Sequence, residues 1–140
     1  PRLLDMGIEG YLAASTINAV IAQRLVRKIC TVCTVETKPD LAIISKLTND
    51  MGIDTAHMKF YKGKGCVECH GSGFSGRIGI YEVLPVSEKV RTLVIKKVAS
   101  NDILQEAKNE GMLTMLQDGI SKVSAGLTTI DQVLQAVIDN

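Results

Sequence analysis

The chain has 140 residues, of which 46% are hydrophobic and only 4% aromatic, and Trp is absent. This composition excludes a disordered chain and predicts an aliphatic core in one ordinary domain or two small ones. The net charge of +1 gives no sign of a nucleic-acid or membrane-binding surface, and no apolar run approaches the roughly 18 residues of a membrane span.

The first ten residues, "PRLLDMGIEG", bear on the compartment. They lack the basic and apolar regions of a signal peptide, so we expect reduced thiols in a cytosol. The chain also begins with Pro rather than Met, which predicts a fragment of a longer protein with further motifs upstream.

The first predicted element is a helix over residues 16–29, with Ser15 or Thr16 as its N-cap. Its apolar positions follow a helical spacing: Ile17, Val20, Ile21, Leu25 and Ile29. A second helix is expected over 41–50, with Asp40 as N-cap and Gly52 as its stop. Residues 57–62 predict a short strand, residues 63–76 a glycine-rich loop, and residues 77–86 a strand that ends before or at Pro85.

Four short helices are expected after that strand. Ser87 and Ser100 are predicted N-caps of the first two, and the spacing of Thr114 with Gln117 and of Thr129 with Gln132 predicts capping boxes for the others. Joints of a few residues predict that these helices pack as a compact bundle. We interpret Tyr11, Phe74 and Tyr81 as core residues, and Arg77 with Glu82 as a structural ion pair.

The four cysteines form two pairs, Cys30-x-x-Cys33 and Cys66-x-x-Cys69, with 32 residues between them. A two-residue gap lets a tight turn direct both sulfurs at one ion, and two such turns supply the four thiolates of a closed structural zinc site. Nearby cations would offset the negative charge of such a site: Lys28, Lys62, Lys64 and Arg77. His70 is a possible substitute ligand, although solvent or the outer shell is the expected place for it.

Other interpretations of the cysteines stay open. Disulfides, buried structural thiols and redox catalysis are alternatives, but redox pairs usually follow a strand at the start of a helix, whereas Cys30 is expected to follow a helix. Residues 66–73 also match CxxCxGxG, the zinc-binding repeat of J-type chaperones. That motif occurs once here, whereas the chaperone domains repeat it four times.

Several motifs together resemble the C-terminal part of the bacterial traffic ATPases of type II secretion and type IV pilus assembly. The resemblance covers nearly the whole chain and rests on residues 23–27 (QRLVR), the four cysteines, residues 76–82 (GRIGIYE) and residues 126–129 (GLTT). The cysteine pairs indicate the assembly-type members. The resemblance implies a cytoplasmic homohexameric motor, peripheral to the inner membrane, that couples ATP hydrolysis to pilin or pseudopilin extrusion. Its implied partners are neighbouring subunits, a platform protein in the inner membrane and other machinery components.

The chain lacks the G-x-x-x-x-G-K-[ST] phosphate loop and an acidic Walker B segment. We therefore expect no catalytic residues and no enzyme activity in this chain alone, with ATP and Mg²⁺ bound only by the full-length protein. The resemblance suggests Arg24 and Arg27, one turn apart on the polar side of the predicted helix, as contacts to nucleotide or to a neighbouring subunit. A solvated helix end is the alternative.

The predicted fold is mainly α with a small β element. Residues 1–29 are expected to form the helical tail of an ATPase core, 30–75 the tetracysteine zinc module, and 76–140 a short strand and a helical bundle. A chaperone-like or nucleic-acid-binding zinc module is the alternative function. The last helix, "IDQVLQAVIDN", carries two Asp and no basic residue, which argues against a nucleic-acid partner.

Overall fold

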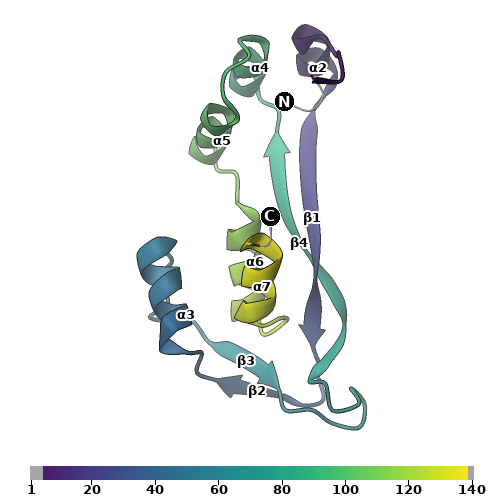
Figure 1. The fold of residues 1–140 in the computed structure, drawn as a ribbon, viewed down its shortest axis with the longest axis vertical. Coiled ribbons are helices and arrows are strands. Elements are labelled where there is room, and N and C mark those ends of the chain that lie inside the picture. Colours follow the sequence, from purple (N-terminus) through teal and green to yellow (C-terminus); the bar gives the residue numbers. More distant parts are fainter. Residues whose placement is uncertain (1–4, 139–140) are drawn as a thin grey trace. The chain divides into compact units, whose positions relative to one another are not determined.

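A computed structural model describes residues 5–138; residues 1–4 and 139–140, at the ends of the predicted 1–29 and 76–140 ranges, lie outside this description (Figure 1). The chain divides into two compact units. One comprises the chain up to Gln23 together with Tyr81–Met115, and the other comprises Arg24–Ile80 and the chain from Leu116 on. None of the helices in residues 5–138 has the length and apolar character that crossing a membrane requires.

The helix predicted over residues 16–29 is wrong, because most of this segment is strand β1 (Ala19–Ile29). It pairs with β4 (Phe74–Pro85) in an antiparallel two-stranded sheet (Figure 1). The segment is rich in β-branched residues, which favour strands, and β4 supplies the hydrogen bonds that a helix would make internally. Ser15 and Thr16 are not N-caps: they lie at the end of helix α2 (Gly10–Thr16), where both hydroxyls donate to the Leu12 carbonyl.

The first unit packs α2 against α4 (Glu88–Ile95), and α4 against α5 (Ser100–Asn109). The predicted cap at Ser87 is confirmed, because its hydroxyl accepts a hydrogen bond from the Val90 N–H at 3.2 Å. Ser100 begins α5 rather than capping it, since the N-cap position is Ala99. Arg91 joins the first two helices by donating to the carbonyl of Ala14 and, at 3.2 Å, to the side chain of Asn18.

The second unit contains the antiparallel pair β2 (Thr34–Thr37) and β3 (Phe60–Gly63), in which Thr34 lies opposite Gly63. The helix predicted over 41–50 is present as α3 (Leu41–Ser45), which continues into a π-helical segment η1 (Lys46–Asp50). Asp40 caps α3 as predicted, with its carboxylate accepting from the Ala42 N–H at 3.0 Å.

Helices α6 (Met115–Ser124) and α7 (Ile130–Ile138) complete the second unit. They pack closely, since a Cβ added at Gly119 would lie 2.4 Å from Val133 Cγ1. The core of this unit is aliphatic, as the composition predicts, and includes Val26, Ile29, Leu47, Ile80, Val123 and Val133.

The four late helices do not form the single predicted bundle, because α4 and α5 belong to the first unit and nearly all of α6 and α7 to the second. The mainly α class with small sheets is confirmed. The predicted order of an N-terminal helix, a zinc module and a bundle is not confirmed, because most of the segment predicted as the helix before the cysteines is strand β1.

Candidate metal centre

The four cysteines lie at the ends of strands. Cys30 directly follows β1 and Cys33 directly precedes β2, while Cys66 and Cys69 lie in the loop between β3 and β4. The two turns are joined by backbone hydrogen bonds, from the Cys30 N–H to the Gly73 carbonyl at 3.0 Å and from the Lys64 N–H to the Cys33 carbonyl at 3.0 Å. The strands thus bring together cysteine pairs that are far apart in the sequence.

The four sulfur atoms all lie within 4.8 Å of one another. The Sγ–Sγ distances are 3.8 Å for Cys30–Cys66, 3.8 Å for Cys33–Cys69 and 3.6 Å for Cys66–Cys69. At the usual Zn–S distance of about 2.3 Å, sulfurs at the corners of a tetrahedron stand about 3.8 Å apart. No disulfide joins these four cysteines, which are free thiols. The cluster therefore has the donor set and the spacing of a tetrahedral metal site.

Hydrogen bonds to sulfur make the four thiols unequal. Burial raises the pKa of the Cys69 thiol, but N–H groups of Cys66 and Gly73 donate to its sulfur at 3.2 and 3.3 Å and lower the pKa to about 6. Burial instead raises the pKa of Cys33 to about 12, against an opposing backbone hydrogen bond from Gly65. A bound cation must therefore displace a proton from at least Cys33 at neutral pH.

Glycines allow the two turns to approach this closely. A Cβ at Gly63 would lie 2.0 Å from the Gly73 carbonyl oxygen, and one at Gly65 would lie 2.6 Å from the Gly71 carbonyl oxygen. Real Cβ atoms do not approach so near, and Gly65 and Gly73 also have positive φ angles of 88° and 75°. His70 is exposed and is not part of the four-thiol cluster.

Arg24 and Arg27 do not share a helical face, because both lie in β1 and their odd spacing places them on opposite faces of the strand. The Arg27 guanidinium stacks over the Phe74 ring, with its Cζ 4.3 Å from the ring centroid. The backbone of Arg27 is also held: its N–H donates to Gln132 Oε1 at 3.2 Å, and its carbonyl accepts from Thr128 Oγ1 at 2.7 Å.

The predictions for the aromatic residues and the ion pair are largely wrong. Tyr11 and Tyr81 are 61% and 39% exposed, and Phe74 is half-buried beneath Arg27. Arg77 and Glu82 form no ion pair within residues 5–138, and their odd spacing in β4 directs them to opposite faces. The Glu82 carboxylate instead accepts from the Met115 N–H at 3.1 Å.

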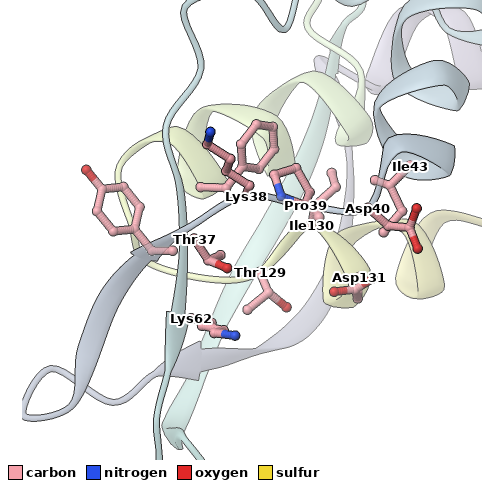
Figure 2. A pocket seen from close by; sticks show the side chains of 11 residues that line it. Thr37, Lys38, Pro39, Asp40, Ile43, Lys62, Thr129, Ile130 and Asp131 are labelled. Atoms are coloured by element: carbon pink, nitrogen blue, oxygen red, sulfur yellow. The ribbon is translucent and has the colours of Figure 1, made fainter.

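A pocket of about 380 Å³ in the second unit was not predicted, because no motif marks it. Figure 2 shows side chains from the β2–α3 connection, from β3 and from the start of α7 around it. Its charged lining groups have both signs: Lys38, Lys62, Asp40 and Asp131. Its floor is apolar, with Phe60 and Ile130 buried. Only a comparison of distant segments could have revealed it.

Comparison with known proteins shows one family throughout. The sequence model of a family described as "Type II/IV secretion system protein" matches residues 1–135. The chain is 36% identical to a type IV pilus assembly ATPase PilB of Thermus thermophilus, over 99% of the chain and 15% of that protein. It is also 36% identical to type II secretion system protein HxcR and to type II secretion system protein E, both of Pseudomonas aeruginosa. These matches cover 99% and 96% of the chain, and 25% and 26% of the two proteins.

Proposed function

Because the chain belongs to the type II/IV secretion system protein family, we propose that it is the C-terminal region of a hexameric secretion or pilus assembly ATPase. The chain spans about a quarter or less of the length of these relatives. The full-length protein would couple ATP hydrolysis to the extrusion of pilin or pseudopilin subunits. ATP and Mg²⁺ would bind in that protein and not in this chain alone, which has no phosphate loop.

The chain's own contribution would be structural. Cys30, Cys33, Cys66 and Cys69 would hold one Zn²⁺, which would cross-link the end of β1 to the loop before β4. The observation that carries this proposal is the cluster of four sulfurs within 4.8 Å of one another, with three Sγ–Sγ distances of 3.6 to 3.8 Å that match a tetrahedral zinc–thiolate site. Zinc has no redox chemistry, so its role there is to fix the backbone. In this proposal residues 1–29 end the ATPase core, 30–75 form the zinc module, and 76–140 form the C-terminal region.

The proposed partners follow from the family. They are neighbouring subunits of a homohexamer, an inner-membrane platform protein and other machinery components, with no nucleic acid. The protein would be cytoplasmic and peripheral to the inner membrane. Arg24 and Arg27 are the proposed contacts to nucleotide or to an adjacent subunit, since a guanidinium binds both phosphate and carboxylate in a two-pronged geometry.

Native mass spectrometry of the chain, with free thiols counted before and after a strong chelator, tests the zinc site. We expect one zinc per chain and four thiols released on chelation. Cys69→Ser should abolish stoichiometric binding, whereas the matched variant His70→Ala should retain it, because His70 lies outside the cluster. A metal-free chain with two disulfides would contradict the proposal.

The motor function needs the full-length protein. We expect it to hydrolyse MgATP in a concentration-dependent assembly, and the isolated chain not to do so. Salt-dependent DNA binding by the chain would instead favour a nucleic-acid-binding zinc module, and capture of an unfolded substrate protein would favour a chaperone-like one.

A further inference from the structure

We propose that Arg27 binds an oxyanion, and that Phe74, Thr128 and Gln132 are positioning residues that hold it in a binding-ready orientation. This inference rests on the proposed function, which supplies two sources of the oxyanion: a phosphate of the nucleotide or a carboxylate of a neighbouring subunit. It adds three residues, from two distant parts of the chain, to which neither the family match nor the motifs assign a role.

The stack on Phe74 orients the side chain of Arg27. The guanidinium is planar, so when its face covers a ring its N–H groups remain free at the edge. No hydrogen bond or ion pair occupies those N–H groups among residues 5–138. Arg27 is exposed, whereas Phe74 is half-buried and so provides a fixed platform. An exposed arginine normally loses side-chain entropy when it binds, and a stack formed in advance reduces that loss.

The backbone of Arg27 is held by residues just before α7 and in its first turn. The Thr128 hydroxyl, which is fully buried, donates to the Arg27 carbonyl, and the Gln132 side chain accepts from the Arg27 N–H. The N–H of Ile29, two residues on, donates to the Leu127 carbonyl at 2.9 Å. Residues 127–132 therefore satisfy both backbone groups of Arg27 and the N–H of Ile29, and the Arg27 Cα cannot shift along the strand without breaking these bonds.

Phe74 is held just as firmly. Its N–H donates to Ser72 Oγ at 3.2 Å, and the Ser72 hydroxyl is within hydrogen-bond distance of the Phe74 and Cys69 carbonyls. The preceding residue, Gly73, accepts from the Cys30 N–H at 3.0 Å. Both partners of the stack thus sit on backbone that is anchored near the cysteine cluster. This arrangement suits Arg27 for a two-pronged bond to an oxyanion.

The test uses the full-length protein with Phe74→Leu, Phe74→Tyr, Arg27→Ala and the double variant Arg27→Ala/Phe74→Leu. Steady-state MgATP hydrolysis is measured over a range of ATP and of protein concentrations. Phe74→Leu keeps apolar volume but removes the π face. We expect it to impair the same step as Arg27→Ala, which is oxyanion binding, and to weaken that step by about two- to fivefold. Phe74→Tyr keeps the ring and should restore that step.

The two sources of the oxyanion separate in this experiment. A nucleotide phosphate predicts a raised KM for ATP at every protein concentration. A subunit carboxylate predicts an unchanged KM once assembly is saturated and a shift of activity to higher protein concentration. In either case Phe74→Leu should have no further effect in the Arg27→Ala background, because it acts through Arg27.

A second readout does not depend on activity. NMR of the chain should show the Arg27 side-chain protons shifted upfield by the Phe74 ring, with the shift lost in Phe74→Leu and kept in Phe74→Tyr. Wild-type kinetics for Phe74→Leu in an active motor, or effects of Phe74→Leu and Arg27→Ala that multiply, would overturn the positioning role alone. A full-length protein with neither hydrolysis nor assembly would overturn the proposed function, and this inference with it.

Discussion

Thr128 donates its hydroxyl hydrogen to the carbonyl of Arg27 at 2.7 Å, across a separation of 101 residues. Thr128 is fully buried, so its hydroxyl has no water as an alternative partner. This bond fastens the segment between α6 and α7 to strand β1. It is a buried polar contact whose loss has a measurable cost.

The Thr128→Val variant tests that contact. Valine has nearly the same shape but no donor, so the Arg27 carbonyl loses a partner and the chain should lose about 1–3 kcal/mol of unfolding free energy. Urea denaturation followed by circular dichroism measures the change. Thr34→Val, at an exposed strand position, is the control and should stay within about 0.5 kcal/mol of the parent. Equal stability of both variants would show that Thr128 is not a fastening point.

The Gly73→Ala variant tests whether the metal centre depends on space. A Cβ at Gly73 would lie 2.6 Å from the Gly63 carbonyl oxygen, so the turns should move apart and zinc affinity should fall by at least tenfold. Gly71→Ala is a matched control in the same loop. Its φ of 76° is almost that of Gly73, at 75°, but no atom lies within 4 Å of its added Cβ. Competition with a zinc-binding dye compares the two variants, and equal affinities would contradict the steric argument.

The ion pair between Lys89 and Glu106 predicts a pH dependence of the first unit. The Lys89 ammonium lies 2.8 Å from Glu106 Oε1, and this hydrogen bond lowers the pKa of Glu106 and raises the pKa of Lys89. The stabilisation from Glu106 is present above its unfolded-state pKa and is lost as the pH falls through its lowered folded-state pKa. That from Lys89 is present below its unfolded-state pKa and is lost as the pH rises through its raised value.

An NMR titration of the Glu106 carboxyl carbon should therefore give a midpoint below that of an ordinary glutamate. The thermal midpoint of the chain should fall in acid less steeply for Glu106→Gln than for the parent. Glu68→Gln, an exposed position in the cysteine loop, should leave the acid limb unchanged. A normal midpoint for Glu106 would mean that the pair does not persist in solution.

Arg91 predicts how strongly α2 is attached to α4. Its guanidinium donates to the Ala14 carbonyl and to Asn18, and Ala14 is 2% exposed. Arg91→Ala should cost about 1.5–3 kcal/mol, because charged donors make the stronger hydrogen bonds. The loss should appear as faster hydrogen exchange in residues 10–16. Lys96→Gln, at the exposed end of α4, should leave that exchange unchanged, and protection unaffected by Arg91→Ala would refute this attachment.

Local signals in the sequence were enough to predict local structure. The caps at Asp40 and Ser87 are confirmed because a short polar side chain before an apolar run has its partner two or three residues away. The cysteine pairs converge as predicted, since their spacing restricts each turn to a few geometries. These features needed no knowledge of distant parts of the chain.

The strand over residues 19–29 was missed for a physical reason. A strand with one buried face shows alternation, but residues 19–25 are exposed on both faces, so their apolar residues carry no period of two. What makes this segment a strand is its pairing with β4, which a local pattern cannot reveal. The stack of Arg27 on Phe74 was hidden for the same reason, because it depends on the register between these two strands.

The backbone approach between the two cysteine turns has a consequence for how such centres are recognised. Ligands of one metal can be exchanged chemically, since a histidine nitrogen binds zinc as a cysteine sulfur does. The missing side chains at Gly63, Gly65 and Gly73 have no such substitute, because any added carbon would occupy the place of an opposing peptide group or take a positive φ. A search for related modules should therefore treat these three glycines as part of the signature. A sequence that keeps the four ligands but has larger residues at these positions should hold its metal in a different geometry.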